Sequence, residues 1–331
     1  MKKQWIVAIV AVYIIFIFSL VVYSGEKTHV FKIGILSVNA DRLEKIQGLR
    51  DGLERLRYQE GQNVIYTSRN AKDDLDKLPL LADELLKGKP DVLVAAGAAE
   101  AGALKNATSE LKSPPPVIFM GTLSPVKLGL VDSATQPSGN LTGLDNYHLE
   151  LTPKRIEILH RLLPEIRSVA VLGDKRILAY EQIQETVQLI AKEFPLTIKM
   201  YTVGSVEEVE PVFREMQREK VEAIVLLPGF FLETNTEQII SQATQRSLPV
   251  FGLYPSDAEK GCLASYGTSY FDQGAQTAQM VDKVLKGAKP GEIPVETPDK
   301  LVFVINLKTA RELGITLSPT VLSFADKVIQ P

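Results

Sequence analysis

The stretch DVLVAAGAAEAGALKNAT, residues 91–108, decides the fold class of this chain. Its apolar run from Val92 to Ala96 has the length of a buried strand, and at Gly97 it passes directly into an alanine-rich helical segment. A buried strand that leads through glycine into a helix is typical of parallel α/β sheets. The small side chains at this strand end also leave the main chain open to a ligand.

Phosphate binding is the first hypothesis for such a strand end, because the free N–H groups and the dipole at a helix N-terminus attract anions. From Gly97 the sequence reads G-A-A-E-A-G, which matches neither G-x-G-x-x-G nor G-x-x-x-x-G-K-[ST]. The glycine and the lysine that let these motifs bind phosphate are therefore missing. The stretch does not predict an ATPase or a dinucleotide enzyme.

Strands and helices alternate through the first half of the chain. Apolar faces at helical spacing separate the strands; one consists of Leu43, Ile46, Leu49, Leu53 and Leu56. The expected strands are residues 31–38, 63–69, 91–97, 116–122 and 140–144. Repeated strand, helix, strand units predict a parallel sheet that helices cover on both faces.

The same pattern restarts near residue 168. Five further strands are expected at 168–174, 196–203, 222–229, 249–254 and 262–268, with helices near 180–193, 206–219 and 235–246. Roughly 305 residues follow the N-terminal segment, a length that suits two domains of about 150 residues. Ligands of open parallel sheets bind beyond the carboxyl ends of the strands, so two facing sheets predict a cleft between two lobes.

The N-terminus has the pattern of an exported protein. Lysines at positions 2 and 3 precede nineteen residues, 5–23, that are apolar or aromatic apart from Ser19. Residues 1–24 are predicted to be either a signal peptide cleaved near Gly25 or a transmembrane anchor, because about 20 apolar residues suffice to span a bilayer. Both alternatives place the body of the protein outside the cytoplasm, in the periplasm or at the cell surface.

Composition and motifs argue against several other classes of function. Cys262 is the only cysteine and lies far from the N-terminal segment, so neither a lipid anchor there nor an intramolecular disulfide is expected. A formal net charge of -3 without a basic stripe does not indicate nucleic-acid binding. His29, His148 and His160 lack metal-ligand spacing, and no G-x-S-x-G elbow occurs. We expect no metal, no cofactor and no catalytic activity.

Seven stretches of the chain together carry a family resemblance. They are KIGIL, GLRDGLERLRYQEGQNV, LADELLKGKPDVLVAAG, PVIFMGTLSPVKLGLV, PSGNLTGL, SYGTSYFDQGAQTAQMVDKVLKGAKPGEIPVE and INLKTARELGITLSPTVLSFADKVI. In order and spacing they resemble the ABC transporter substrate-binding proteins of the type I periplasmic binding protein class, in particular the branch with tryptophan- and tyrosine-binding members. The resemblance covers about residues 31–329.

The resemblance implies an α/β fold of two Rossmann-like lobes with parallel sheets, joined by a hinge of three crossovers. The crossovers are expected near residues 145–152, 268–272 and 292–300. Lobe 1 is expected to comprise residues 31–145 plus 270–290, and lobe 2 residues 150–268 plus 300–331.

Loops at the strand ends and at the first crossover are the candidate ligand-binding elements. The candidate residues are Ser37, Asn39, Gly97, Ala98, Ala99, Gly121, Thr122, Ser124, Asp145, Asn146, Asp174, Phe230, Phe231, Tyr254 and Tyr266. Six residues have an alternative, structural role. Asp145 and Asn146 would form turns or caps, Phe230 and Phe231 would pack in the core, and Tyr266 and Tyr270 would pack in the hinge. The loop that contains Lys175 and Arg176 is expected to be solvated or to meet an anionic ligand.

Four positions depart from the amino-acid site that the resemblance implies. Ala98 and Ser124 stand where relatives usually carry a hydroxyl residue and an aspartate. The loop Lys175-Arg176-Ile177-Leu178 replaces asparagine, proline or serine, and Phe230-Phe231 replace a polar or acidic residue. Each change removes a group that would hold a zwitterion, whereas aromatic side chains offer a surface for stacking. A flat or weakly charged ligand is therefore expected to bind better than a small polar amino acid.

The resemblance implies an extracytoplasmic solute-binding protein of an ABC-type uptake system. Such a protein closes two lobes over a small ligand, here one that is aromatic or weakly charged, and presents the closed form to a membrane permease. The alternative is a membrane-tethered sensor or interaction module of the same fold that signals to a partner. The unbroken apolar segment 5–23 and the altered site residues favour this alternative.

Overall fold

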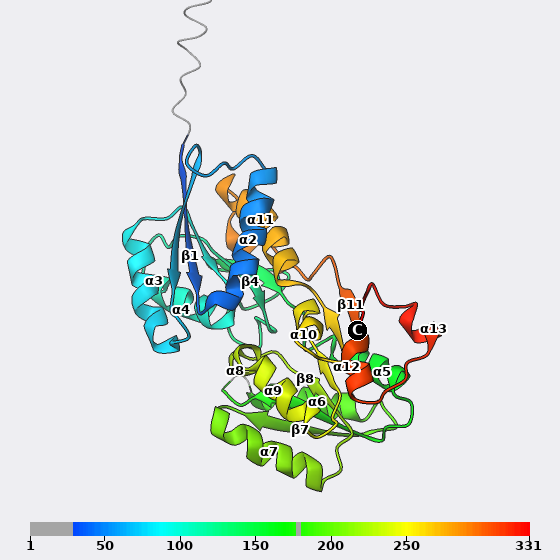
Figure 1. Cartoon of the computed structure of the whole chain (residues 1–331). Helices are drawn as coiled ribbons and strands as arrows, with labels where there is room; N and C mark the ends of the chain where they lie inside the picture. The colour runs from blue at the N-terminus through cyan, green and yellow to red at the C-terminus, as the bar shows by residue number, and fades with distance from the viewer. Residues whose placement is uncertain (1–28, 177–179) are drawn as a thin grey trace, which may run out of the picture.

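The computed structural model describes residues 29–176 and 180–331. The predicted signal or anchor segment at 1–24 lies outside the described residues, as do Ile177 and Leu178. The described residues form two lobes, each built on one sheet (Figure 1). Within this part of the chain, no helix has the length and apolar character needed to span a bilayer.

Lobe 1 is built on a five-stranded parallel sheet with the strand order β2-β1-β3-β4-β5. Its strands are β1 (Phe31–Ser37), β2 (Val64–Asn70), β3 (Val92–Ala95), β4 (Val117–Thr122) and β5 (Leu141–Asp145). Its helices are η1 (Ala40–Arg42), α2 (Leu43–Arg55), η2 (Leu75–Lys77), α3 (Leu78–Lys87) and α4 (Ala98–Thr108), and α11 (Tyr270–Leu285) and η3 (Pro290–Glu292) join them from far along the chain.

Strand β3 explains why the strands of lobe 1 read as unbroken apolar runs. Successive side chains of a strand point to opposite faces of the sheet. Val92 and Val94 pack into the apolar cluster under α2 and α11, whereas Leu93 and Ala95 pack into the cluster under α3 and α4. Because helices cover both faces, each position of β3 is buried.

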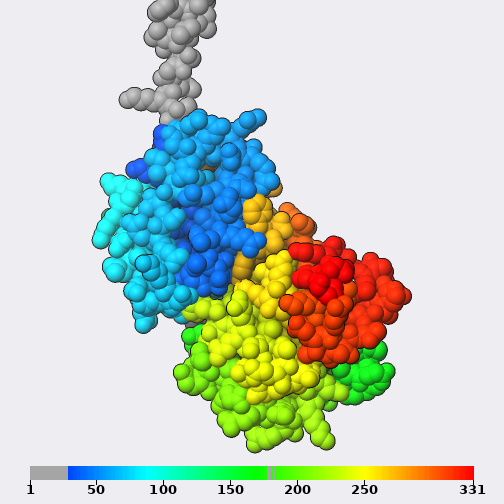
Figure 2. All heavy atoms as spheres, viewed as in Figure 1, coloured from blue at the N-terminus to red at the C-terminus, as the bar shows by residue number. Residues whose placement is uncertain are grey.

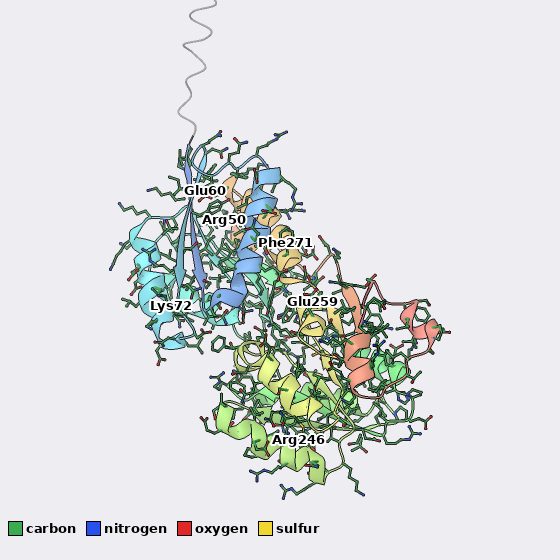
Figure 3. All side chains as sticks on the ribbon, viewed as in Figure 1. Arg50, Glu60, Lys72, Arg246, Glu259 and Phe271 are labelled. Carbon is green, nitrogen blue, oxygen red and sulfur yellow. The ribbon has the colours of Figure 1, made fainter. Side chains whose placement is uncertain are left out.

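Helix α11 packs closely against α2 on one face of this sheet (Figures 1 and 3). A Cβ atom built on Gly48 of α2 would lie 2.0 Å from the carbonyl oxygen of Phe271, which Figure 3 labels on α11 beside α2. A Cβ atom on Gly274 of α11 would lie 1.9 Å from the carbonyl oxygen of Lys45. Glycine at both positions therefore permits a close helix contact, which places the start of α2 beside Tyr270.

Lobe 2 is built on a seven-stranded sheet with the order β12-β11-β10-β9-β8-β6-β7. Its strands are β6 (Ser168–Asp174), β7 (Thr197–Val203), β8 (Ala223–Leu226), β9 (Val250–Gly252), β10 (Ala264–Gly267), β11 (Val302–Asn306) and β12 (Lys327–Ile329). Its helices are α5 (Thr152–Leu162), α6 (Tyr180–Ala191), α7 (Val206–Arg218), α8 (Phe230–Thr234), α9 (Thr236–Thr244), α10 (Pro255–Glu259), α12 (Leu307–Glu312) and α13 (Pro319–Leu322). Apolar clusters fill both faces of this sheet too.

The sheet of lobe 2 is mixed, which the sequence did not predict. Strand β11 pairs antiparallel with β10, and β12 pairs parallel with β11, so these two strands run against the other five. Neither was among the predicted strands. The reason is topological: the chain enters lobe 2 at this edge from lobe 1 and so runs in the opposite direction. An antiparallel edge strand on an otherwise parallel sheet is common in α/β folds.

The chain passes between the lobes three times, and this confirms the predicted three-crossover fold. It leaves the sheet of lobe 1 after β5, returns from β10 into α11, and enters lobe 2 again at β11. A β-bridge between Leu144 and Glu296 holds the segment before the third crossover against lobe 1. Figure 2 shows the two lobes as two masses in contact, with the orange atoms of α11 against the blue atoms of lobe 1. The exact lobe boundaries stay a prediction.

Candidate functional site

A cleft lies between the two lobes at the carboxyl ends of their strands. It contains about 920 Å³ of space between atoms, its open mouth included. The loops after β1, β3 and β4 line it from lobe 1, and the loops after β6, β8 and β9 line it from lobe 2. Nine of the residues predicted from the strand ends line this cleft: Gly97, Ala98, Ala99, Gly121, Thr122, Asn146, Asp174, Phe230 and Tyr254.

The other six predicted residues lie outside the lining of this cleft. Five of them lie behind the lining or in the hinge, where their side chains or backbone groups contact other protein atoms. These five are Ser37, Asn39, Ser124, Asp145 and Phe231. Tyr266 lies on β10, where its ring packs against Phe303 of β11 with the ring centroids 6.5 Å apart. It lines a separate pocket of lobe 2, together with Phe303.

Main chain at two glycines forms part of the wall from lobe 1, beside the apolar side chains of Val38, Leu75, Leu123, Leu128 and Leu130. Gly97 is the N-cap of α4, and no side chain caps this helix, so its first-turn N–H groups open toward the cleft. Gly121 has φ +74°, and a Cβ atom there would lie 1.8 Å from Oε1 of Gln273. A side chain at either glycine would therefore narrow the cleft or displace its wall. Helix N-termini of this kind attract carboxylate and other anionic groups.

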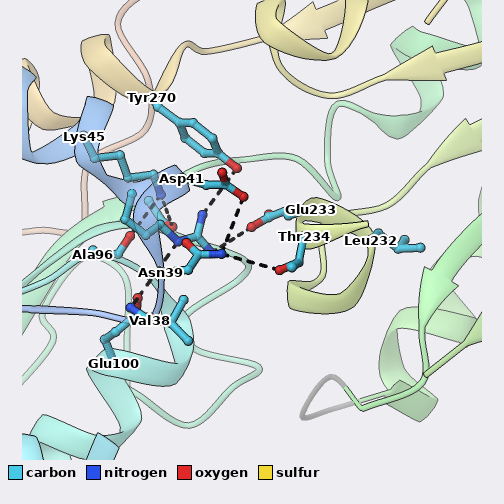
Figure 4. Close-up of polar contacts among 12 residues, drawn as sticks. Val38, Asn39, Asp41, Lys45, Ala96, Glu100, Leu232, Glu233, Thr234 and Tyr270 are labelled. Atoms are coloured by element: carbon cyan, nitrogen blue, oxygen red, sulfur yellow. Dashed lines mark hydrogen bonds and ion pairs between the residues drawn. The ribbon is translucent and has the colours of Figure 1, made fainter. Parts of the chain in front are cut away.

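Three charged residues also line the cleft, and the sequence analysis missed them: Arg42, Glu100 and Glu233. Nη2 of Arg42 lies 2.7 Å from Oε2 of Glu233, which belongs to the other lobe. Figure 4 shows Glu233 and Thr234 of that lobe facing Asn39 of lobe 1. Glu100 accepts a hydrogen bond from the backbone N–H of Val38 and lies 4.0 Å from Nε of Arg42. Burial alone would lower the pKa of Arg42, but electrostatic interactions with Glu233, Tyr270, Glu100 and Tyr254 together outweigh burial and raise that pKa well above its ordinary value.

Lys45 lies fully buried behind Arg42 and supports the lobe 1 wall. Its Nζ donates hydrogen bonds to the carbonyl oxygens of Ala96 at 3.1 Å and Met120 at 2.8 Å. Ala96 follows β3 and precedes Gly97, and Met120 of β4 precedes Gly121. Burial, and then the positive charge of Arg42, lowers the pKa of Lys45 to about 7. Lys45 thus joins the ends of two strands at the cost of a buried charge.

The wall from lobe 2 combines an ion pair with aromatic rings. The carboxylate of Asp174 lies 3.2 Å from both Nε and Nη2 of Arg176 and accepts the backbone N–H of Phe231 at 2.7 Å. The guanidinium of Arg176 lies 5.8 Å from the ring centroid of Phe230. Phe230 also packs against the apolar cluster of lobe 1, so it contacts both lobes. Both charges of this wall are therefore compensated within the protein.

Tyr254 lies where the hinge meets the cleft. Its ring packs edge-on against His148 at 4.7 Å and lies 4.2 Å from the ring of Tyr270, centroid to centroid. Its hydroxyl donates a hydrogen bond to Oε1 of Glu233 at 3.0 Å. Burial, and then the charge of Glu233, raises the pKa of Tyr254 well above its ordinary value, so the hydroxyl keeps its proton. Behind it, the buried Arg155 donates to the carbonyl oxygens of His148 and Tyr266 and so ties two crossovers together.

Asp145 and Asn146 form a turn in the first crossover. Oδ1 of Asp145 accepts the backbone N–H of Tyr147 at 2.8 Å and of Ser124 at 3.3 Å. Tyr147 has φ +59° and Ser124 φ +43°, so the carboxylate holds two residues in the left-handed region. Oδ1 of Asn146 accepts the N–H of His148 at 3.1 Å. The side chains of both residues thus stabilise the turn by accepting its backbone N–H groups, and Asn146 also lines the cleft.

Asp145 should make stability depend on pH. Burial raises its pKa from 3.8 to about 6, and the nearby Glu150 adds to the increase, while the hydrogen bond from Tyr147 opposes it. A raised folded-state pKa contributes stability that is full below pH 3.8 and is lost as the pH rises through 6. Asp145→Asn keeps an Oδ1 acceptor and removes the charge. We expect it to raise the free energy of unfolding at pH 7 by up to about 3 kcal/mol, the equivalent of a shift of about two pKa units, and to leave it nearly unchanged at pH 4.

Urea unfolding of both proteins at several pH values between 4 and 7 checks this expectation. Asp83→Asn, on the exposed surface of α3, is the control and should follow the pH curve of the parent protein. An Asp145→Asn variant whose stability falls as steeply with pH as that of the parent would contradict the proposed titration.

The missed residues Arg42 and Glu233 follow candidate loops by only three residues. Arg42 lies in the helical turn after Asn39, and Glu233 lies in the short helix that begins at Phe230. A search of the first helical turn after each strand end would have found both. Their charge alone gave no such signal, because charged residues at helix starts are usually solvated.

Comparison with known proteins places the whole body of the chain in one family. Residues 32–329 match the family model described as ABC transporter substrate binding protein. A tyrosine-binding protein from Clostridioides difficile (strain R20291) is 25% identical over 270 residues, which cover 81% of this chain and 76% of that protein.

Two solved structures are also similar. One is a conserved domain protein from Vibrio cholerae O1 biovar El Tor, with a TM-score of 0.82, 28% identity and coverage of 90% of this chain and 99% of that one. The other is an ABC domain from Streptococcus pneumonia in complex with L-Trp, with a TM-score of 0.81, 28% identity and coverage of 91% and 100%. A periplasmic ribose ABC transporter from Conexibacter woesei and an ABC sugar transporter subunit from Rhodobacter sphaeroides, each 14% identical, share the fold. This chain belongs to the ABC transporter substrate-binding protein family.

Proposed function

We propose that this chain is the extracytoplasmic solute-binding protein of an ABC-type uptake system and that its two lobes close over a small aromatic ligand. The observation that carries the proposal is the composition of the cleft: open main chain at Gly97–Ala99 on one side, and Phe230 and Tyr254 on the other. The closing lobes are residues 31–145 plus 270–290 and residues 150–268 plus 300–331. Contacts that exist only when the lobes meet would shift the population toward the closed form.

The charges around the cleft favour a ligand without net charge. Arg42 faces Glu233 and Glu100, and Arg176 faces Asp174, so each cation already has an anionic partner. A ligand with a net charge would need an oppositely charged partner, but the charged side chains of the cleft are already paired with one another. An unpaired charge in a cleft costs several kcal/mol. A ring that stacks on an aromatic side chain contributes about 0.5–1.5 kcal/mol beyond its buried area.

A single carboxylate or carbonyl can still be accommodated at the N-terminus of α4. The relatives support an aromatic amino acid as the first candidate, since one is a tyrosine-binding protein and another was solved with L-Trp. Tryptophan and tyrosine carry a ring, a carboxylate and no net charge. Purines share the flat ring and the lack of net charge, so they are the second candidate class.

The test is calorimetric titration of residues 25–331 with tryptophan, tyrosine, adenine, alanine and glutamate. We expect a ring compound to bind and alanine and glutamate to bind more weakly or not at all. Phe230→Ala should weaken binding of the ring compound about tenfold, which is the loss of one stacking contact. Phe324→Ala, on an exposed side chain that lines another pocket, is the matched control. Micromolar binding of alanine or glutamate without binding of any ring compound would refute the proposed ligand class.

The alternative proposal is a membrane-tethered sensor with the same lobes. The apolar segment 5–23 favours it, because an uncleaved anchor would suit a protein that signals to a membrane partner. N-terminal sequencing of the natural protein distinguishes the two forms, since cleavage would give a new N-terminus near Gly25 and an anchor would leave Met1. Genes for a permease and an ATPase beside this gene would support uptake, and a gene for a signalling protein would support the sensor.

A further inference from the structure

An ion pair bridges the two lobes beside the cleft. Nη2 of Arg42, the N-cap of α2 in lobe 1, lies 2.7 Å from Oε2 of Glu233, on α8 in lobe 2. The exposed fractions of the two side chains are only 9% and 12%. Nδ2 of Asn39 lies 3.5 Å from Oγ1 of Thr234, so a second polar contact joins the same two segments.

Each member of the pair has further polar partners: Arg42 lies 4.0 Å from Glu100 of lobe 1 and contacts Tyr270 at the hinge, and Glu233 contacts Tyr254 of lobe 2. Nη1 of Arg42 donates to the hydroxyl of Tyr270 at 3.3 Å on α11, which packs on α2. Oε1 of Glu233 accepts the hydroxyl of Tyr254 at 3.0 Å. The bridge therefore connects two anchored groups, and it cannot persist if the lobes rotate apart. Its formation thus depends directly on lobe closure.

The pair consists only of protein groups. At 2.7 Å the two side chains are in direct contact, so no ligand atom is needed to join them. If the lobes open, Arg42 keeps Glu100 and Tyr270, Glu233 keeps Tyr254, and water can solvate both charges. Opening is therefore possible, but it separates a close ion pair between two buried side chains, and a buried charge that loses its partner is costly until water solvates it.

We propose that Arg42 and Glu233 form an interlobe latch that favours the closed form of this protein whether or not a ligand is bound. The latch goes beyond the proposed function, because it needs no assumption about the ligand. The latch raises the fraction of ligand-free protein that is closed. Less of the ligand's binding energy is then needed to close the lobes.

The experiment measures the distance between the lobes with two spin labels. Asp76→Cys in lobe 1 and Arg218→Cys in lobe 2 place the labels on exposed residues, and Cys262 is fully buried and so stays unlabelled. The protein is unfolded in guanidinium, dialysed and refolded to remove any co-purified solute. Pulsed EPR then gives the distance distribution without added ligand.

Glu233→Gln removes the charge with almost no change of shape, and we expect it to lower the ratio of closed to open protein about tenfold. Arg42→Gln should produce the same shift, and adding Glu233→Gln to Arg42→Gln should produce little more, because the two residues act as one pair. Glu237→Gln on the exposed surface of α9 is the matched control and should leave the distribution unchanged.

An unchanged distance distribution in both Glu233→Gln and Arg42→Gln would overturn the latch, as would an equal shift in Glu237→Gln. Circular dichroism confirms that each variant is folded, and either pair member suffices for the test if the other fails to fold. Because no ligand is present, failure of the latch leaves the proposed ligand class untouched. Failure of the titrations with ring compounds would likewise leave the latch intact.

Discussion

Gly48→Ala and Gly274→Ala should each lower the free energy of unfolding by about 3 kcal/mol, the upper part of the usual range for overpacking. In both cases the new methyl group would meet backbone rather than a flexible side chain: Cβ would lie 2.0 Å from the carbonyl oxygen of Phe271 or 1.9 Å from that of Lys45. Helices α2 and α11 would have to separate. For a body of about 300 residues that unfolds as one unit, the change corresponds to a fall in melting temperature of roughly 5 °C.

Gly102→Ala provides the matched control for this prediction. Gly102 lies within α4, and a Cβ atom there would have no heavy atom within 4 Å. Alanine is favoured over glycine inside a helix by about 1 kcal/mol, so this variant should be slightly more stable than the parent. Thermal unfolding followed by circular dichroism measures all three. A Gly48→Ala or Gly274→Ala protein as stable as Gly102→Ala would show that the helix contact is looser than described.

The close contact of α2 with α11 also has a functional consequence. It places Arg42 and Lys45 of one segment beside Tyr270 of another that follows the second crossover. Separation of the helices would therefore disturb both the latch and the support of the lobe 1 wall. We expect the glycine variants to lose closure along with stability.

The fold was predictable because burial on both faces leaves a clear trace in the sequence. In β3 every side chain is apolar, and a glycine and a helix follow, so residues 91–108 indicated a parallel sheet without further information. Strand β11 was missed for the opposite reason. Its run VFVIN follows a segment rich in proline and charge, and nothing local shows that it adds to the edge of a sheet formed by distant strands.

The site was predictable only where it consists of strand ends. Gly97 and Gly121 were predictable because each follows an apolar run in the sequence. The contact between Arg42 and Glu233 was not predictable, because it depends on how the two lobes meet. The buried Arg155 escaped notice for a similar reason. Arginine is normally exposed, and its burial here is possible because carbonyl oxygens of two crossovers accept its hydrogen bonds.

Ala98→Asp should weaken the binding of a ring compound that carries a carboxylate at least 100-fold, about 2.7 kcal/mol. Ala98 is the first residue of α4 and lines the cleft where the free N–H groups of this helix open. An aspartate there would supply the anion that these groups attract, and its charge would repel the carboxylate of the ligand. The folded state should remain intact, because an acidic residue in the first turn suits the helix dipole.

Ala98→Asn separates charge from shape, since asparagine has nearly the size of aspartate without its charge. We expect Ala98→Asn to weaken binding of tryptophan much less than Ala98→Asp does, and we expect both variants to bind adenine, which has no carboxylate, with similar affinity. Calorimetric titration of the three proteins with tryptophan and adenine gives the comparison. Equal losses for the two variants with tryptophan would mean that size alone blocks the cleft, and the N-terminus of α4 would then not be the carboxylate site.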